Sequence, residues 1–178
     1  MTTIIMDLSD TRIETKRLVL VPIDLCYADE IFRGLSRDIT QYMFPRPAQH
    51  IGETLDFINR SLTGLADSTN LQMVIVAKGS NEFIGCAGLH YIGTINPELG
   101  IWTKKSAHGH GYGLEAITGL VNWARLNLDF GYMRYPMDRR NYPSRRIALM
   151  NGGIIQKEYR EVNQSGYELE LLEYWITK

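Results

Sequence analysis

Residues 106–117 read SAHGHGYGLEAI, in which three glycines at alternate positions, with two histidines beside them, precede an apolar, helix-like run. Glycine lets the backbone approach a ligand closely and adopt positive φ. The start of a helix carries unpaired N–H groups and about half a positive charge, which attract anions. We therefore expect backbone N–H groups exposed by Gly109, Gly111 and Gly113 to bind a phosphate group. A Walker loop or a dinucleotide fingerprint is not expected, because GK[ST] and the spacing GxGxxG are both missing.

A metal site is the alternative for His108 and His110. We do not expect one, because flexible glycines flank both histidines and the loop offers no third Asp, Glu or Cys ligand. The two cysteines, Cys26 and Cys86, lie far apart and outside any CxxC or Cys/His pattern. They are expected to be buried, reduced thiols and not a disulfide or a zinc site.

The elements that would hold this loop follow from hydrophobic periodicity. The predicted order is a strand, two helices, three strands, a helix, a strand, a helix and two strands, which is typical of one mixed α/β domain over residues 1–178. Pro136 cannot donate to a ladder, so it suits either a strand edge or a place where neighbouring strands part. The predicted strands are residues 17–23, 71–78, 83–92, 98–104, 132–138, 154–159 and 167–176, and the predicted helices are residues 28–35, 51–62, 114–128 and 141–153.

Bulk composition excludes several classes of protein. The net charge is −1, with 19 basic and 20 acidic residues, which argues against nucleic-acid binding. The N-terminal sequence MTTIIMDLSD lacks the pattern of a signal peptide, and no apolar run is long enough to span a membrane. A cytoplasmic protein without nucleic-acid or membrane partners is expected.

Several segments of the sequence resemble those of a known family. HGHGYG followed by LEA resembles the Q/R-x-x-G-x-G/A signature of the GCN5-related N-acetyltransferases (GNAT), with His108 where Gln or Arg is usual. IETKRLVLVPI, PELGIWTKKSAHGHGYGLEA and NYPSRRIALMNGG resemble, in the same order, segments of the branch of ribosomal-protein N-terminal acetyltransferases (RimJ/RimL-like). The resemblance implies a GNAT fold: one mixed, largely antiparallel twisted sheet of about seven strands with a central splay, flanked by about four helices.

The resemblance also implies acetyl-CoA as cosubstrate, no metal, and a set of cofactor-binding residues. The pyrophosphate would lie on the loop, and the pantetheine arm would pair with backbone groups of the strand before it, where the next strand splays away. Asn141 would bind the pantetheine or cap a helix. The implied residues are Ile101, Trp102, Thr103, His108, Gly109, His110, Gly111, Tyr112, Gly113, Leu114, Asn141 and Ser144.

Acetyl transfer needs a neutral amine, so a base or a water-mediated proton relay is expected. Glu98 is the first candidate, although a solvated carboxylate at a strand end is the alternative. His90 is the second candidate, or else a packing or substrate-lining residue. Ser144 matches the serine for which the family implies protonation of the leaving thiolate, and helix capping is its alternative. Candidate residues lining the acceptor site are Tyr42, Phe44 and Arg46.

The predicted activity is acetyl-CoA-dependent N-acetylation of a primary amine, by direct attack in a ternary complex and without a covalent enzyme intermediate. A protein or peptide N-terminal α-amine is the favoured acceptor. Two alternatives stay open: a small-molecule or antibiotic acetyltransferase acting in detoxification or self-immunity, and a catalytically silent CoA-binding module. The sequence is compatible with a monomer or a homodimer.

Overall fold

The computed structural model describes residues 7–178. The first six residues of MTTIIMDLSD, on which the expected absence of a signal peptide partly depends, lie outside the described residues. None of the helices in the described part of the chain is long and apolar enough to cross a membrane.

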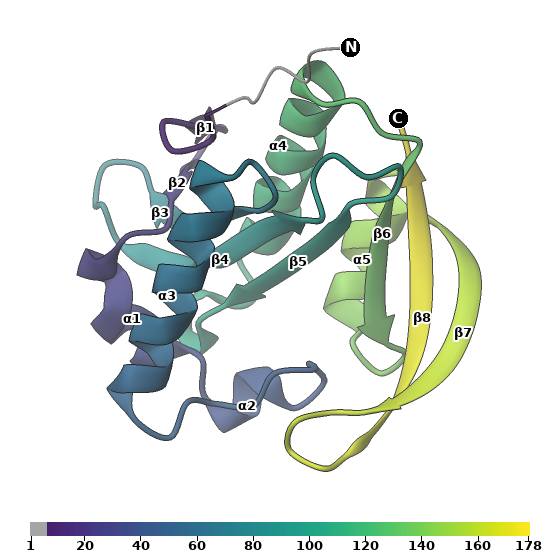
Figure 1. Ribbon diagram of the computed structural model, residues 1–178. Coiled ribbons are helices and arrows are strands. Elements are labelled where there is room, and N and C mark those ends of the chain that lie inside the picture. Colours follow the sequence, from purple (N-terminus) through teal and green to yellow (C-terminus); the bar gives the residue numbers. More distant parts are fainter. Residues whose placement is uncertain (1–6) are drawn as a thin grey trace.

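The strands of residues 7–178 form one eight-stranded sheet in the order β1-β2-β3-β4-β5-β6-β8-β7 (Figure 1). Neighbouring strands are antiparallel except β5 and β6, which are parallel. The predicted mixed sheet is thus confirmed, with one strand more than the expected seven, because two-residue β1 is too short to show an alternating pattern. The strands are β1 (Ile13–Glu14), β2 (Leu18–Pro22), β3 (Leu71–Ala77), β4 (Phe83–His90), β5 (Glu98–Thr103), β6 (Tyr132–Asp138), β7 (Ile154–Val162) and β8 (Glu168–Thr177).

The sheet opens between β5 and β6, as the resemblance implied. These strands share a single register pair, Glu98 with Arg134, and the Arg134 N–H donates to the Pro97 carbonyl at 2.8 Å. Beyond that pair β6 continues beside β8 while β5 diverges from it (Figure 1). Pro136 lies two residues after Arg134, so its backbone nitrogen faces the same, opened edge. A proline there removes a donor that would have no strand partner.

Helices cover both faces of the sheet. The α1 and α3 helices pack on one face, and α4 and α5 pack on the other (Figure 1). In α4 the predicted apolar stripe is buried at Ile117, Leu120, Val121 and Ala124. The one-turn α2 was not predicted, because four residues are too few to show helical periodicity. The helices are α1 (Ala28–Gly34), α2 (Arg37–Thr40), α3 (Ile51–Ala66), α4 (Tyr112–Asn127) and α5 (Tyr142–Met150), with 3₁₀ turns η1 (Leu25–Tyr27) and η2 (Lys105–Ala107).

The cysteines differ in burial, and this corrects one expectation. Both are free thiols, and Cys86 is buried within β4 as predicted. Cys26 is exposed, because it lies in η1 at the surface, where the Asp24 carboxylate accepts a hydrogen bond from its N–H at 2.8 Å.

Candidate functional site

The glycine loop leads into the N-terminus of α4. Gly109 and Gly111 have φ of 79° and 76°, the left-handed region that favours glycine, and Gly111 is the N-cap of the helix. Gly113 lies inside the first turn of α4 with ordinary backbone geometry, so the helix start and not a positive φ leaves its N–H unpaired. A Cβ on Gly113 would lie 3.3 Å from Cδ1 of Ile147. Its missing side chain therefore lets α5 approach α4, and only the first two glycines shape the loop.

Six consecutive N–H groups, those of residues 109–114, donate to no backbone or side-chain acceptor among the described residues. The donors on either side are paired: the His108 N–H bonds to the Lys105 carbonyl, and the Glu115 N–H begins the helical ladder at the Gly111 carbonyl. These six groups, which we call the amide arc, lie at the positive end of a 16-residue helix. Unpaired backbone donors at a helix start form a binding site for an anion.

The two histidines bond within the loop region and do not converge on a common point. The His108 Nε2 lies 3.0 Å from the Thr103 carbonyl oxygen, and the His110 Nδ1 lies 2.8 Å from the His108 carbonyl oxygen. Each of these nitrogens carries the proton, because a carbonyl oxygen can only accept. The His110 ring also stacks on Tyr112. Across residues 7–178, no group of three or more His, Cys, Asp or Glu is placed to hold a metal ion.

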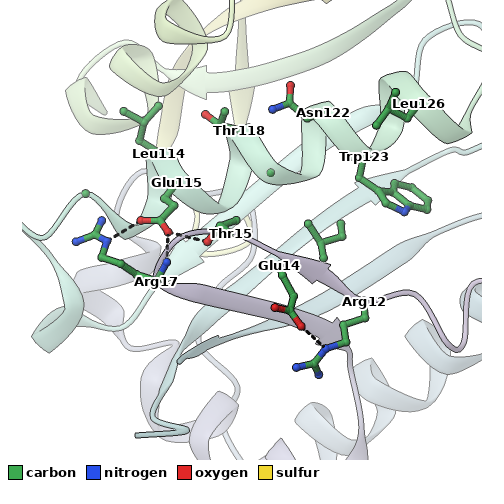
Figure 2. Close-up of a pocket in the computed structure, with 13 residues that line it drawn as sticks. Arg12, Glu14, Thr15, Arg17, Leu114, Glu115, Thr118, Asn122, Trp123 and Leu126 are labelled. Atoms are coloured by element: carbon green, nitrogen blue, oxygen red, sulfur yellow. Dashed lines mark hydrogen bonds and ion pairs between the residues drawn. The ribbon is translucent and has the colours of Figure 1, made fainter. Parts of the chain in front are cut away.

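The Glu115 carboxylate fixes the loop from the opposite side. It accepts hydrogen bonds from the Thr15 hydroxyl at 2.6 Å, the Arg17 N–H at 2.7 Å and the Arg17 Nε at 2.7 Å (Figure 2). The Arg17 guanidinium also donates to the His110 carbonyl at 3.0 Å and lies over the Tyr112 ring. Burial alone would raise the pKa of Glu115, but the bonds from Thr15 and Arg17 lower it. Sequence reasoning did not single out Thr15, Arg17 or Glu115.

A groove of about 740 Å³ runs between β1 and α4 beside this contact (Figure 2). It reaches the glycine loop only at Gly111, and its ionic groups pair with one another, Arg12 with Glu14 and Arg17 with Glu115. Each guanidinium in the groove is already paired with a carboxylate, whereas the donors of the amide arc have no acceptor among the described residues. The arc is therefore the better anion site.

Alternation along β5 decides which backbone groups face the opening in the sheet. The Lys104 N–H donates to the Ile84 carbonyl at 2.8 Å, so even-numbered residues of β5 bond to β4. Trp102 pairs with Cys86, so its backbone groups face β4 and not the opening. The expected backbone contact between Trp102 and pantetheine does not fit this orientation. Ile101 and Thr103 do direct their backbone groups into the opening, although the Thr103 carbonyl is occupied by His108.

At the start of α5, Asn141 is the N-cap and its side chain accepts from the Ser144 N–H at 3.2 Å. The Ser144 hydroxyl lies beside the hydroxyl of Tyr135, which projects from β6 below the helix. Tyr135 is 3% exposed, and its hydroxyl has no well-aligned hydrogen-bond partner among the described residues. Burial raises the pKa of Tyr135 to about 12, and the contact with the Ser144 side chain opposes this rise.

Glu98 is part of a charge network at the closed end of the opening. Its Oε2 lies 2.6 Å from Arg134 Nη2, while Arg134 Nη1 lies 3.6 Å from the buried Glu173. The Trp175 indole donates to Glu173 at 2.6 Å. Burial raises the pKa of Glu98, Arg134 opposes this, and the charges of Glu173 and Glu161 add to the rise.

His90 lies directly beside Glu98. The two are opposite partners in the β4–β5 register, so their side chains share one face of the sheet. Burial lowers the pKa of His90, which favours a neutral imidazole. A neutral imidazole can accept a proton, so His90 can act as a base. The strand register therefore places the two candidate bases, Glu98 and His90, side by side.

The candidate acceptor residues lie in the loop between α2 and α3, which is tied to the β7–β8 turn. The Gln164 N–H donates to the Phe44 carbonyl at 3.0 Å, and the Arg140 guanidinium lies 5.0 Å over the Tyr42 ring. Arg46 is held by Glu53 at 3.0 Å, so its charge is engaged with α3. Phe44 is 46% exposed. Tyr42 and Phe44 therefore stay candidates for the acceptor site.

The family described as "Acetyltransferase (GNAT) domain" matches residues 17–154. Among curated proteins, the chain is 28% identical over 151 residues to "Uncharacterized N-acetyltransferase p20" of Bacillus licheniformis, covering 81% of this chain and 82% of that protein. Among solved structures, it is similar to the RimL ribosomal L7/L12 α-N-protein acetyltransferase in complex with coenzyme A (TM-score 0.83, 16% identity, covering 94% and 98% of the two chains). It is also similar to a spermidine N-acetyltransferase from Vibrio cholerae in complex with CoA and spermine (TM-score 0.78, 16% identity, covering 90% and 95%).

Proposed function

The chain belongs to the GNAT acetyltransferase family, and from this premise we propose that it transfers the acetyl group of acetyl-CoA to the α-amine of a protein or peptide N-terminus. The observation that carries the proposal is the amide arc, six unpaired backbone donors at the start of α4. Each hydrogen bond to a charged oxygen contributes roughly 1.5–3 kcal/mol. A few such bonds to a pyrophosphate support micromolar affinity, which corresponds to about 8 kcal/mol.

The rest of the cofactor site fits the same ligand. Acetyl-CoA supplies a thioester whose acyl carbon is the electrophile. The Ile101 backbone and the Thr103 N–H face the opening between β5 and β6, where an amide-containing arm can add to the unpaired edge. Pro136 on the other edge presents no N–H to compete for that arm.

Glu98 is the residue we assign to removing the proton of the attacking amine, directly or through water. An α-amine, with a pKa near 8, is about a tenth neutral at pH 7 and needs little help, whereas a lysine near 10.4 needs much more. The raised pKa of Glu98 makes it a better proton acceptor than a solvated carboxylate. His90, its register partner, is the second group able to take this proton.

Ser144 is the residue we assign to protonating the departing sulfur as the new C–N bond forms and the C–S bond breaks. The Tyr135 hydroxyl behind it can donate to the Ser144 oxygen and replace the proton that leaves. Neither cysteine suits a covalent route, because burial raises the pKa of the Cys86 thiol, and that of Cys26 is raised as well. These features support direct transfer from the thioester to the amine.

Charge balance near Glu98 supports an α-amine over a polyamine. Glu98 and Glu173 are each engaged by a cation, Arg134 for both and Lys157 at 3.8 Å for Glu173. A polyamine site would need several unpaired carboxylates to hold separated ammonium groups. The two free thiols are typical of a reducing compartment, so the proposal includes a cytoplasmic location.

The test is a thiol-release assay with acetyl-CoA and matched acceptors. Peptides with free and blocked N-termini, each with and without an internal lysine, are compared with spermidine and with small primary amines. Release that requires the free N-terminus supports the proposal. Release with spermidine or a small amine alone supports the detoxification alternative. Binding of acetyl-CoA by calorimetry without release for any acceptor supports the silent binding module.

A further inference from the structure

The β7 strand lies at one end of the sheet and has one unpaired edge. It is the terminal strand next to β8, and all of its 9 residues are exposed. Four large apolar or aromatic side chains are among them, those of Ile154, Ile155, Tyr159 and Val162. A long exposed edge strand is a template for pairing with another chain.

The register with β8 shows which residues of β7 face outward. The Asn163 N–H donates to the Tyr167 carbonyl, and the pairs from Lys157–Glu173 to Val162–Glu168 continue without interruption. Residues 157, 159 and 161 therefore direct their backbone groups to β8, and Glu158 and Arg160 direct theirs outward. The outward groups of Glu158 and Arg160 have no backbone partner among the described residues.

The charges of this edge are self-complementary about Tyr159. The sequence from residue 157 to 161 is KEYRE. If a second β7 runs antiparallel with Tyr159 opposite Tyr159, then Glu158 lies opposite Arg160 and Lys157 lies opposite Glu161. Outward-facing residues then meet outward-facing residues, as an antiparallel ladder requires.

Neighbouring registers do not have this property. A shift of the partner by two residues one way places Glu158 opposite Glu158, and a shift the other way places Arg160 opposite Arg160. Like charges directly opposite one another destabilise a pair of strands, and opposite charges stabilise it. Edge charges of one sign would deter pairing in every register, whereas this order favours one register and disfavours those beside it.

We infer that a second copy of this chain pairs with the first through an antiparallel β7–β7 contact centred on Tyr159, which joins the two sheets. Each Glu158–Arg160 pair then exchanges both backbone hydrogen bonds across the interface. The intrachain partners of these side chains are Arg139, just after β6, for Glu158 and Glu170, in β8, for Arg160, and they join the interface charges in one network. The inference depends on the sheet edge and not on the proposed acceptor.

A cysteine cross-link tests the register. In a Cys26→Ser background, which removes the exposed native thiol, Tyr159→Cys places two thiols at a non-hydrogen-bonded position on the two-fold axis, where Cα atoms lie about 4.5 Å apart. We expect mild oxidation to give a covalent dimer on a denaturing gel. Glu161→Cys in the same background is the control, because residue 161 faces residue 157 of the second copy and forms little dimer.

Sedimentation velocity tests the charge pairing without cysteine. The wild type should sediment as a dimer, with twice the mass of the 20.4 kDa chain. Glu158→Arg should weaken the dimer at least tenfold, while Arg12→Glu, at a surface ion pair beside β1 at the opposite end of the sheet, leaves it unchanged. Acetyl-CoA binding should stay intact in both variants, which separates this test from that of the acetyltransferase site. A monomer at all concentrations, a dimer insensitive to Glu158→Arg, or equal cross-linking at 159 and 161 would overturn the inference.

Discussion

The Nε of Arg17 lies 2.7 Å from Oε2 of Glu115, and this contact joins two segments that are 98 residues apart in the sequence. Arg17 immediately precedes β2 and Glu115 is in the first turn of α4, so the ion pair links the sheet to the start of the helix. The same guanidinium donates to the His110 carbonyl inside the glycine loop. One contact therefore holds both the helix and the loop that carry the amide arc.

Glu115→Gln should weaken acetyl-CoA binding by about tenfold, or about 1.4 kcal/mol. Three donors converge on the carboxylate, and a neutral amide leaves one of them facing an NH₂ group. The loss should appear as a higher dissociation constant in calorimetry. Glu14→Gln is the control, because Glu14 pairs with Arg12 at an exposed position in the same groove. Equal losses in both variants would contradict a specific role for Glu115.

Gly109→Ala should reduce acetyl-CoA affinity far more than it reduces stability. Gly109 has φ of 79°, and a Cβ there meets nothing within 4 Å, so the methyl would project into the space that a phosphate needs. Gly79→Ala is a matched control in the β3–β4 turn, with φ of 85° and equally open space. Both variants should lose about 1 kcal/mol of unfolding free energy from backbone strain, measured by urea denaturation.

Only Gly109→Ala should then raise the dissociation constant for acetyl-CoA, by tenfold or more. If the two variants bound acetyl-CoA equally well, the amide arc would not be the pyrophosphate site.

Much of the fold was predictable because its signals are local. The continuous apolar runs of β3 and β4, the apolar stripe of α4 and the glycines before it all occur within single segments. The order of the motifs, through the family resemblance, implied the splay. The packing role of Gly113 was not predicted, because its neighbour Ile147 comes from α5, which only the fold brings beside α4.

The charge network around Glu98 could not be predicted in the same way. Its members Arg134 and Glu173 come from β6 and β8, and only the strand order brings them together. The direction of the Trp102 backbone depends on which edge of β5 bonds to β4, and alternation alone leaves both possibilities open. Contacts between distant segments are set by register, which a single sequence does not reveal.

Glu98→Gln should remove the acidic limb of the pH–rate profile. A base works when deprotonated, so wild-type kcat/KM should rise with pH through a Glu98 pKa that burial holds above 4.5. The rate loss at pH 7 should be greatest for lysine-like acceptors, on the order of 10²-fold or more. A loss that is equal for all acceptors and at all pH values would argue against a base.

The raised pKa of Glu98 also predicts how Glu98→Gln changes the stability of the protein. A carboxyl group whose folded pKa is raised above its unfolded value contributes stability below the unfolded pKa, and that contribution is lost as pH rises through the folded pKa. At pH 7 the charged form of Glu98 is therefore disfavoured by the fold, and Glu98→Gln should melt no lower than the wild type. A thermal scan at pH 7 checks this and separates lost chemistry from lost folding.

The variant Ser144→Ala distinguishes a role of Ser144 as the general acid from a role as a helix cap. The cap is made by the Ser144 N–H and the Asn141 side chain, and alanine keeps that N–H. Ser144→Ala should thus keep its melting temperature while kcat falls by roughly 10²-fold or more.

Asn141→Ala should lose about 0.5–2 kcal/mol of stability, because it removes the cap itself. Tyr135→Phe should lower kcat less than Ser144→Ala without lowering stability, since it deletes a buried hydroxyl that has no well-aligned partner. Unchanged turnover in Ser144→Ala across the pH range would leave capping as the only role of this turn.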